Sequence, residues 1–482
     1  MEAFTKWLVT VDDVVWGVPM IALILACGVW LTVRTGLLQV FHLGKALRFM
    51  FKNEEEGHGE VSSFGALCTA LSATIGTGNI VGVASAIGAG GPGALFWMEV
   101  AAFFGMATKY SEGLLAVKYR GIDESGHVLG GPFYYIEKGM GGNRFLGISN
   151  WKWLAKLFAV FGTLAGIMGI GTITQINGIT SAAQTFFDPQ KEHVLFTIGS
   201  GEAASAITLT TVIAGLLVTL FTALVVIGGL QRIASVSAII VPFMAVVYIV
   251  CGMLILLGNI AEIPAAVYQI LVGAFSPKAV AGGIVGITIK VAVQKGVARG
   301  IFSNEAGLGS APIAAAAAQT KEPVRQGLVT MTGTFIDTIV ICTMTGLAIV
   351  ISGGWKPELE LEGVQITMYA FQNCLPFSAQ ASSFLLMICL VFFAFTTILG
   401  WDYYSERCLE YLTNGRMGPV KVFRWLYILA VFVGPYLTVK AVWTIADIFN
   451  GLMAFPNIIG LLALSGVVAR ETKAYFAAHK EL

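Results

Sequence analysis

Four adjacent residues, Gly76-Thr77-Gly78-Asn79, place two glycines, a hydroxyl and an amide inside an otherwise apolar stretch of the sequence. Glycine is about 1 kcal/mol less favourable than alanine within a helix, so this pair predicts a point where the backbone leaves the helix. In a membrane the freed N–H and C=O groups need partners, because an unpaired group there is costly. N–H groups at the start of a half-helix attract a carboxylate, and unwound carbonyls attract a cation. An amino acid zwitterion bound together with a sodium ion would satisfy both sets.

Glycines in membrane helices have a second common use, because small residues let two helices approach closely. We prefer this interpretation for Gly82, Gly88 and Gly90, which follow the polar segment. For Gly76-Thr77-Gly78-Asn79 we expect ligand binding instead, since the Asn79 amide adds an oxygen ligand at the same point.

A second interruption, in residues 300–310, reads GIFSNEAGLGS. Two polar, glycine-rich interruptions in corresponding parts of a membrane protein are typical of the central site of a transporter. Two adjacent hydroxyls, Thr396 and Thr397, lie in another apolar stretch, where they either hold a hard cation or bond back to their own helix. Gln175 and Asn177 are amides in a further apolar stretch, where they bond a neighbouring helix or a ligand.

Charged residues within apolar stretches are candidates for function and have to be weighed singly. Lys109 and Glu112 are three residues apart on one helical face, and we interpret them as an ion pair. Glu99 is a candidate proton site unless it lies near a helix end. Glu305 is expected to bond backbone amides exposed at the second interruption. Asp337 fits no recognisable pattern.

The composition places these residues in a lipid bilayer. Of the 482 residues 56% are hydrophobic and only 12% are charged, and the mean hydropathy is +0.79. Soluble domains are about half apolar and about a quarter charged, so an all-α membrane protein is predicted. Spans of about 20 apolar residues predict about 11 transmembrane helices, near residues 13–33, 64–88, 94–117, 154–187, 206–229, 232–257, 282–317, 327–352, 381–406, 421–439 and 443–468. The stretches 154–187 and 282–317 are long enough to contain a break or a tilt.

The charges between these spans predict an orientation. Basic residues such as Lys45 and Arg416 fall in alternate loops, and the opposite loops carry acidic residues such as Glu360 and Glu362. Because basic loops stay in the cytoplasm, the N-terminus is predicted outside and the C-terminus in the cytoplasm. The longest polar insert, about 118–153, is expected to form a cytoplasmic loop with a short interfacial helix.

The number of spans predicts an internal repeat. Without the first span, ten remain, and they divide into two groups of five that run in opposite senses. We therefore predict a single transmembrane domain over 1–482. It consists of an extra N-terminal helix and loop in 1–60, a first five-helix repeat in 61–257 and a second in 258–482. The two interruptions then fall in the opening helix of each repeat.

Other functional classes fit the sequence less well. The net charge of +1 leaves no excess that would attract nucleic acid. The five histidines lie at expected helix ends, in loops or in the tail, which argues against a membrane enzyme with a histidine-based site. A channel would need a symmetric oligomer or a filter ring, and two inverted repeats predict neither.

Longer motifs carry a resemblance to a known family. They are ATIGTGNIVGVASAIGAGGPGALFW (73–97), GMATKYSE (105–112), GGPFYYIEKGM (130–140), RGIFSNEAGLGSAP (299–312) and TTILGWDYYSERCLEYL (396–412). On these motifs the chain resembles, over nearly its whole length, the alanine or glycine:cation symporter family of the amino acid, polyamine and organocation superfamily. The resemblance implies the leucine-transporter (LeuT) fold with an extra N-terminal helix. TIGTGN also resembles the G-x-G-N break in the first core helix of the neurotransmitter:sodium symporters.

The second resemblance implies how substrate and ions share the site, with the N–H groups of Thr77 and Gly78 on the substrate carboxylate. The implied sodium ligands form two sets: the carbonyl of Thr74 with the side chains of Asn79 and Ser303, and the carbonyls of Ser72 and Ile75 with the hydroxyls of Thr396 and Thr397. The expected lining of the substrate site is Gly76, Thr77, Gly78, Gln175, Phe302, Asn304, Thr397 and Trp401. Phe302 and Trp401 are expected to close it, because large rings admit a methyl group and little more.

The resemblance implies import of alanine, glycine or both by symport with sodium, through alternating access, in the cell membrane of a prokaryote. Apart from sodium as coupling ion no cofactor is expected, and no enzymatic activity. The alternative within the same fold is a proton-coupled carrier of small neutral amino acids, in which Glu99 or Glu305 would titrate.

Overall fold

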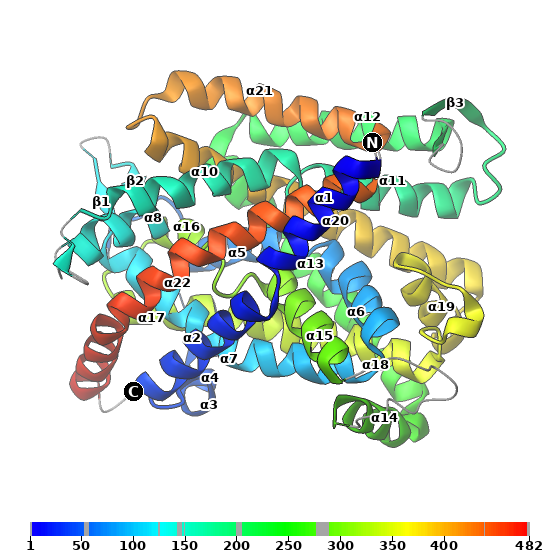
Figure 1. Cartoon of the computed structure of the whole chain (residues 1–482), viewed down its shortest axis with the longest axis horizontal. Coiled ribbons are helices and arrows are strands. Elements are labelled where there is room, and N and C mark those ends of the chain that lie inside the picture. Colours follow the sequence, from blue (N-terminus) through cyan, green and yellow to red (C-terminus); the bar gives the residue numbers. More distant parts are fainter. Residues whose placement is uncertain are drawn as a thin grey trace.

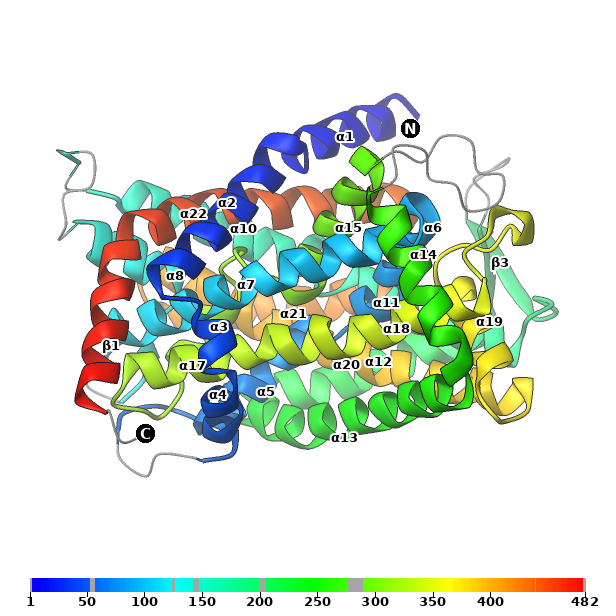
Figure 2. The ribbon, with the colours of Figure 1, turned by 90° about the horizontal axis from the view of Figure 1, so that it is seen from below.

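The computed structural model of the chain describes residues 2–52, 57–123, 126–141, 147–148, 150–198, 205–275, 289–437 and 439–479. Most of these residues lie in helices, and many of the helices run along the long axis of the molecule (Figures 1 and 2). In the described part, strands occur in two short antiparallel hairpins. The prediction of an all-α membrane protein is confirmed at this level.

The elements follow in three groups. The N-terminal group contains α1 (Glu2–Val15), α2 (Val18–Arg34), α3 (Leu38–Phe41) and α4 (Leu43–Phe51). The second group contains α5 (Ser63–Thr74), η1 (Gly78–Gly82), α6 (Val83–Gly90), α7 (Gly93–Lys118), β1 (Gly121–Ile122), β2 (Val128–Leu129), α8 (Pro132–Tyr134), η2 (Tyr135–Met140), α10 (Lys152–Met168), α11 (Ile173–Phe187), β3 (Val194–Ile198), β4 (Ser205–Thr208), α12 (Leu209–Val226) and α13 (Gly229–Gly258).

The third group contains η5 (Ile260–Glu262), α14 (Ile263–Phe275), α15 (Ile289–Asn304), α16 (Ala311–Ala316), α17 (Pro323–Thr334), η6 (Phe335–Cys342), α18 (Thr343–Ser352), η7 (Pro357–Leu359), α19 (Val364–Cys374), α20 (Ala379–Leu412), α21 (Met417–Val433), η8 (Gly434–Tyr436) and α22 (Val439–Ala478).

Nine of the predicted spans correspond to apolar helices of sufficient length. Among the described residues eight helices are long and apolar enough to cross a membrane, and the bent pair Ser63–Thr74 and Gly78–Gly90 makes a ninth span. The predicted stretch 94–117 is the 26-residue helix α7, which carries four charged residues. The predicted stretch 282–317 begins in residues 282–288, which lie outside the described residues, and continues as α15 and α16.

The long stretch 154–187 contains the expected break. Helix α10 ends at Met168 and α11 begins at Ile173. The turn between them is tightly packed, because a Cβ atom on Gly169 would lie 2.0 Å from the Cβ of Ala446.

The polar insert after α7 differs from its prediction as an interfacial helix. It forms the β1–β2 hairpin and then the short helices α8 and η2, where Phe133 and Tyr135 are 1% and 0% exposed. Gly131 has a φ of +130°, and a Cβ on Gly130 would lie 2.3 Å from the Cβ of Ala316. These glycines turn the chain into the protein, so the segment packs inside and does not lie on a membrane surface.

Two long helices, α7 and α20, form the centre of the molecule. Helix α7 packs against α15 and α17, and α20 packs against α10, α11 and α13. The first broken helix lies between them, since α5 contacts α20 while α6 contacts α7 and α15. A Cβ on Gly400 of α20 would lie 2.7 Å from the Cβ of Ala73, so glycine is required for this contact.

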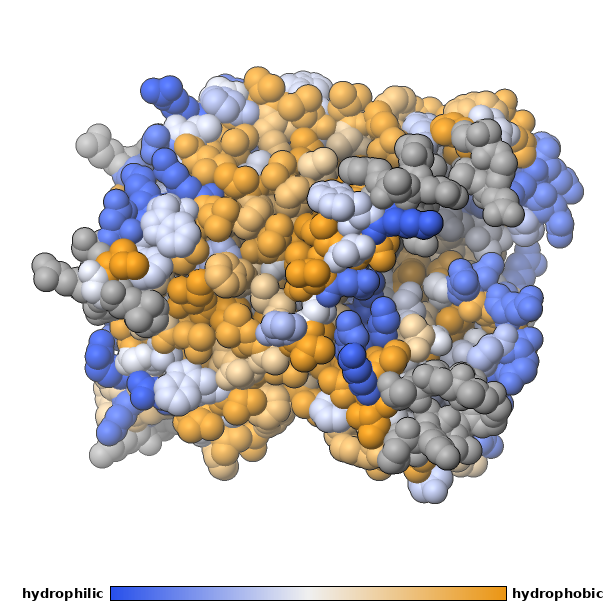
Figure 3. Space-filling model, in the orientation of Figure 1, coloured by the Kyte–Doolittle hydropathy of each residue, from blue (hydrophilic) through white to orange (hydrophobic). Residues whose placement is uncertain are grey.

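The two ends of the long axis differ in content. Figure 2 places β1, α8 and the C-terminus at one end, called here the β1 end, and β3 with α19 at the opposite, β3 end. Between them, Figure 3 shows hydrophobic residues over most of the middle of one face, with hydrophilic residues gathered toward both ends. Such an apolar belt suits a protein surrounded by lipid.

Candidate functional site

The first predicted interruption is a real break in a helix. Helix α5 ends at Thr74, Ile75 is extended with ψ of 94°, and the two halves meet at 51°. The side chain of Asn79 closes the gap, because its Oδ1 accepts a hydrogen bond of 2.9 Å from the N–H of Gly76. The break is therefore stabilised by one of the residues that the sequence singled out.

Both glycines of the break have close neighbours. A Cβ on Gly76 would lie 2.5 Å from Thr397 Oγ1, and a Cβ on Gly78 would lie 3.3 Å from the Cα of Ser303. The break therefore touches α20 on one side and the end of α15 on the other. Gly82 differs, because a Cβ there would meet nothing within 4 Å, so its prediction as a packing glycine is wrong.

The second interruption follows α15 directly. Glu305, Gly307 and Gly309 have φ values of 56°, 90° and 82°, which interrupt the helix before α16 begins. Asn304 caps the end of α15, since its Oδ1 accepts a hydrogen bond of 2.9 Å from the N–H of Ala306. Its amide donates to Thr338 Oγ1 at 3.1 Å. Asn304 thus bonds the protein at the break.

Two carboxylates support the second interruption, and their roles differ from those expected. Glu305 accepts hydrogen bonds from the hydroxyl of Ser310 and from Trp401 Nε1, not from backbone amides. The backbone N–H of Gly309 donates instead to Glu112, at 3.2 Å. Trp401 is fully buried here, and a Cβ on Gly171 would lie 2.4 Å from its Cβ.

Asp337, which fits no recognisable pattern in the sequence, joins the two breaks. Asn79 Nδ2 donates to Asp337 Oδ1 at 2.8 Å, and Ser303 Oγ donates to Asp337 Oδ2 at 2.9 Å. Thr338 Oγ1 donates to the same Oδ2 at 2.7 Å. Asp337 lies in η6, a π-helical stretch, and such stretches inside α-helices are frequent at functional sites. Its position as a carboxylate inside an apolar span was the signal that could have identified it.

The side chain of Gln175 bonds the backbone N–H group that was predicted to hold the substrate carboxylate. The N–H of Thr77 donates to Gln175 Oε1 at 3.3 Å, and Gln175 Nε2 donates to the carbonyl of Ile170 at 3.0 Å. The residue lies just after the break between α10 and α11, which explains how it reaches the first break. Phe302 lies beside the same point, since a Cβ on Gly78 would be 3.5 Å from its Cδ1.

The two adjacent threonines of α20 point in different directions. Thr397 Oγ1 bonds the carbonyl of Phe393 in its own helix at 3.0 Å and also reaches the carbonyl of Ile75 at 3.3 Å, so it lies against the first break. Thr396 Oγ1 bonds the carbonyls of Phe392 and Phe393, both at 3.0 Å, within its own helix. The hydroxyls of Ser72 and Thr74 likewise bond carbonyls of α5. Of the ligands expected for the second sodium ion, Ile75 and Thr397 therefore lie together. The Thr396 hydroxyl does not join them.

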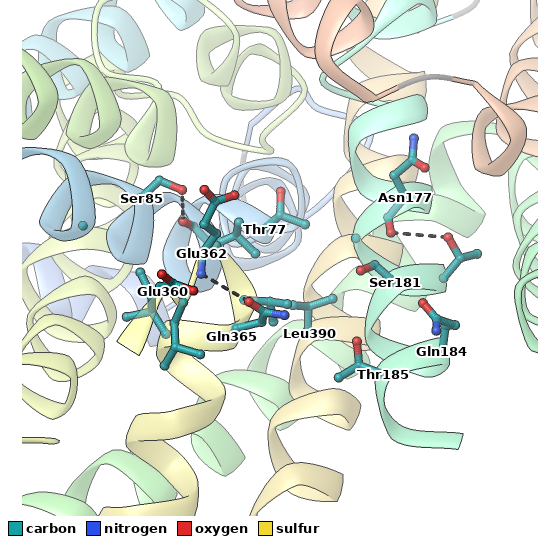
Figure 4. A pocket seen from close by; sticks show the side chains of 18 of the residues that line it. Thr77, Ser85, Asn177, Ser181, Gln184, Thr185, Glu360, Glu362, Gln365 and Leu390 are labelled. Carbon is teal, nitrogen blue, oxygen red and sulfur yellow. Dashed lines mark hydrogen bonds between the residues drawn. The ribbon is translucent and has the colours of Figure 1, made fainter. Parts of the chain in front are cut away.

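A cavity of about 940 Å³ leads from the first break toward the β3 end. Thr77 and Leu390 line it beside the break, and Lys191 and Glu362 line it farther out. In Figure 4, Thr77 and Ser85 lie on one side of the cavity, across from the polar side chains of α11. The break is thus the point where this cavity meets the buried polar residues.

The whole sequence matches one family model, described as the sodium:alanine symporter family, over residues 1–482. The chain belongs to this family. It is 51% identical to an uncharacterized transporter of Haemophilus influenzae, over 97% of this chain and 95% of the relative. It is 45% identical to the sodium/alanine symporter AgcS of Methanococcus maripaludis, over 98% and 97% of the two chains. A putative sodium/proton-dependent alanine carrier protein, YrbD of Bacillus subtilis, is 35% identical over 97% and 92%.

These matches confirm the resemblance to the alanine or glycine:cation symporter family, and the chain is a multi-pass membrane protein of a transporter family. The site is accordingly interpreted as that of a carrier, not of an enzyme. Within the described ranges, no group of three or more His, Cys, Asp and Glu side chains is arranged to hold a metal ion. The oxygen atoms around Asp337 are of the kind that suits a hard cation such as sodium.

The symporter also contains a ring of charges at its β1 end. His127, in the β1–β2 hairpin, bonds Glu60 through Nδ1 at 2.9 Å and Glu410 through Nε2 at 2.8 Å. Arg407 bonds the same two carboxylates at 3.1 and 2.8 Å. The hydrogen bonds with Glu410 and Glu60 raise the pKa of His127 to about 9, against the opposing effects of burial and of Arg407. The ring links the segment before α5 to the end of α20.

A second link lies beside this ring. Arg120 donates to the carbonyls of Ala316 and Ala318 at 2.7 and 2.6 Å and to those of His58 and Thr320 at 2.6 and 2.8 Å. Four carbonyls around one guanidinium join the segment before α5 to the segment after α16. The ends of both broken helices are thus tied together at the β1 end.

Proposed function

We propose that this chain imports alanine, and glycine as a smaller substrate, by symport with sodium across the cell membrane of a prokaryote. The observation that carries the proposal is the meeting of Asn79, Ser303 and Asp337, from three separate elements, next to the cavity residue Thr77. Helix breaks with exposed N–H and C=O groups are suited to an amino acid and a cation together. The relative AgcS bears the name sodium/alanine symporter, which supports the same substrate and ion.

The substrate carboxylate would bind the N–H groups of Thr77 and Gly78. To do so it would displace Gln175 Oε1 from Thr77, so Gln175 would hold the amide in the absence of substrate. The closeness of Phe302 to Gly78 and of Thr397 to Gly76 supports a narrow site with room for a small side chain. Trp401, bonded to Glu305, would act from the second break as a wall of the site.

One sodium ion would bind the carbonyl of Thr74 and the side chains of Asn79 and Ser303, with Asp337 supplying the negative charge. Three donors already converge on Asp337, which supports a cation replacing part of this hydrogen bonding. A second sodium would bind the carbonyls of Ser72 and Ile75 and the hydroxyl of Thr397. Thr396 would join this second site after rotation of its side chain, since its hydroxyl now bonds its own helix.

Transport would follow alternating access in a LeuT-type fold of two inverted five-helix repeats behind an extra N-terminal helix. The charge pattern of the loops favours the β3 end as extracellular, with the N-terminus outside, and the β1 end as cytoplasmic. The cavity that leads from Thr77 toward the β3 end supports an outward-facing arrangement. Release into the cell would then require the contacts at the β1 end to open.

Uptake by proteoliposomes tests the proposal. Radiolabelled alanine and glycine are offered with an inward sodium gradient, with a proton gradient, or with neither. We expect accumulation with the sodium gradient alone. Accumulation that follows the proton gradient would support instead the proton-coupled alternative, which the name of the relative YrbD also suggests. Absence of uptake for both amino acids under a sodium gradient would contradict the substrate class.

A further inference from the structure

A buried amide, Asn457, joins the second break to two other parts of the protein. It lies in α22 and is 0% exposed. Its Nδ2 donates to the carbonyl of Gly307 at 2.8 Å and to Glu112 Oε1 at 2.7 Å. Its Oδ1 accepts a hydrogen bond from the hydroxyl of Tyr135, in η2. The side chain of Asn457 thus bonds the second break, α7 and the polar insert after α7.

These bonds provide partners for backbone groups that the second break frees. The carbonyl of Gly307 bonds Asn457 directly, and the N–H of Gly309 bonds Glu112 Oε1, the same oxygen that Asn457 holds. Freed backbone groups at membrane depth are costly unless they find partners, so the break needs these contacts. The packing is also close, because a Cβ on Gly309 would lie 2.9 Å from the Cγ of Asn457.

A short segment connects these contacts to the proposed ion site. The N–H of Leu308 donates to the carbonyl of Glu305 at 3.2 Å, and the N–H of Glu305 donates to the carbonyl of Ile301 at 2.8 Å. Residues 301–308 are therefore linked by consecutive hydrogen bonds. Ser303, whose hydroxyl donates to Asp337 at 2.9 Å, lies within this segment. A movement of the segment relative to α22 would therefore shift the Ser303 hydroxyl.

The polar insert relates this contact to the β1 end. Tyr135 is 0% exposed and packs on α22, where a Cβ on Gly460 would lie 3.4 Å from Tyr135 Cε2. The same insert contains His127, which bonds Glu60 and Glu410 in the ring of charges. Under the proposed function the ring separates when the β1 end opens, and a movement of the insert would then reach Asn457 through Tyr135.

We propose that Asn457 is a positioning residue for the ion site, and that its bond with Tyr135 makes sodium affinity depend on the polar insert. This inference rests on the proposed function and extends it to the release of sodium. With the β1 end closed, the amide holds the second break and keeps Ser303 beside Asp337. Withdrawal of the insert on opening would remove the Tyr135 bond and loosen the break, so sodium would bind less tightly on the side where it is released.

Two substitutions and a control in the same helix separate this role from packing. Asn457→Leu keeps a similar volume and removes the bonds to Gly307, Glu112 and Tyr135, whereas Tyr135→Phe removes only the hydroxyl that donates to Asn457. Asn450→Leu is the control, because Asn450 is a 0% exposed amide of α22 whose Oδ1 and Nδ2 bond no residue that the structure describes. The measurements are the sodium concentration for half-maximal alanine uptake in proteoliposomes and the midpoint of thermal unfolding.

We expect Asn457→Leu to raise this sodium concentration by about fivefold or more and Tyr135→Phe by about threefold, because each loses hydrogen bonds that hold the break. Asn450→Leu should stay within about twofold of the wild type, since it shares no hydrogen-bond partner with Asn457. The double variant of Tyr135 and Asn457 should equal Asn457→Leu alone, because Tyr135 acts through Asn457. A merely structural role would lower the unfolding midpoint without changing the sodium concentration.

An unchanged sodium concentration in Asn457→Leu, or an equal rise in Asn450→Leu, would overturn the inference. Additive effects in the double variant would overturn the link through Tyr135. If Asn457→Leu does not fold, Tyr135→Phe decides: equilibrium binding of radioactive sodium to the purified variant should be weaker than in the wild type, and equal binding would overturn the inference. Wild-type uptake that does not depend on sodium would refute the proposed function itself, whereas sodium-dependent wild-type uptake with unchanged variants would refute the inference alone.

Discussion

At the scale of single residues, two amides complete the hydrogen bonding of the first break from within the protein. Asn79 Oδ1 accepts from Gly76, and Gln175 Oε1 accepts from Thr77. Buried backbone N–H groups need such partners, and the bonds are exchanged more easily than broken. Under the proposed function, substrate and sodium would each break one of these two hydrogen bonds on binding. The affinity for each ligand is therefore reduced by the free energy of the bond that it replaces.

Asp337 provides the clearest test of the ion site. Asp337→Asn keeps the size of the side chain and removes its charge. We expect the sodium concentration for half-maximal alanine uptake to rise by about tenfold or more, because a nearby unit charge attracts a cation by several kcal/mol in a partly buried site. Asn79→Ala should shift it in the same direction by removing the proposed oxygen ligand. Glu471→Gln, a change of charge at the protein surface, serves as control, and a wild-type sodium dependence in Asp337→Asn would exclude Asp337 from the site.

The adjacent threonines of α20 allow a matched comparison. Thr397→Val removes the hydroxyl that faces Ile75, and Thr396→Val removes one that bonds its own helix. We expect Thr397→Val to reduce sodium-dependent uptake by about tenfold or more, and Thr396→Val to have a smaller effect. Sodium titration of uptake by the two purified variants measures the difference. Equal losses would indicate that both hydroxyls bind the ion after a rotation of Thr396.

At the scale of elements, the site depends on three helix breaks and two π-helical stretches, η1 and η6. The sequence predicted the breaks at Gly76 and after Phe302, since glycine and polar residues stand out inside apolar spans. These breaks carry Thr77, Gly78 and Ser303 to their positions. The stretch η6 was not predicted, because Phe335–Cys342 reads as an ordinary apolar helix apart from Asp337.

A pair of glycines in the first broken helix tests how tightly this element fits. In Gly76→Ala the new methyl group would lie 2.5 Å from Thr397 Oγ1, whereas in Gly82→Ala it would meet nothing within 4 Å. We expect Gly76→Ala to lose most alanine uptake, and Gly82→Ala to retain it with equal or slightly higher thermal stability, because alanine favours a helix more than glycine does. Uptake and the midpoint of thermal unfolding of both variants are measured together. Full activity in Gly76→Ala would mean that the contact with α20 is not required.

The sequence predicted helix existence well and contacts between helices poorly, for a physical reason. Apolar length identifies a span without saying which face it buries, and in a central helix such as α7 nearly every face is buried. The pairing of Lys109 with Glu112 was therefore inferred from spacing alone, although the helix directs Glu112 to Gly309 and not to Lys109. The meeting of Asn79 with Asp337, 258 residues apart, has no local signal in the sequence.

At the scale of the whole molecule, the two ends are built differently. Toward the β3 end a cavity reaches Thr77, and at the β1 end the ring of His127, Glu60, Arg407 and Glu410 joins the segment before α5 to α20. Under the proposed alternating access one end opens as the other closes, so the ring is a set of contacts that would separate during transport. When charged groups separate into water, their hydration offsets most of the interaction energy lost between them, so such a contact is reversible.

The charge on His127 predicts how these contacts respond to pH. Its pKa is raised from an ordinary 6.5 to about 9 by the hydrogen bonds with Glu410 and Glu60. A raised pKa means that the stabilising contribution is complete below about pH 6.5 and is lost as the pH rises through about 9. Burial alone would raise the pKa of Glu60, but the interactions with His127 and Arg407 outweigh burial and lower that pKa. Glu60 therefore stays ionised throughout this range. The loss at alkaline pH is therefore assigned to His127.

Hydrogen–deuterium exchange measures this loss where it should occur. We expect the backbone protection of the β1–β2 hairpin, corrected for the intrinsic effect of pH, to fall between pH 7 and about pH 9.5 in the wild type. His127→Gln should show low protection at both values, because glutamine cannot carry the charge that binds two carboxylates. His479→Gln, at a half-buried position just after α22 where His479 pairs with Glu322 and with no member of the ring, should behave as the wild type. Protection that stays constant with pH in the wild type would contradict this prediction. It would show that Arg407 alone holds Glu60 and Glu410, so that opening of the β1 end does not depend on the charge of His127.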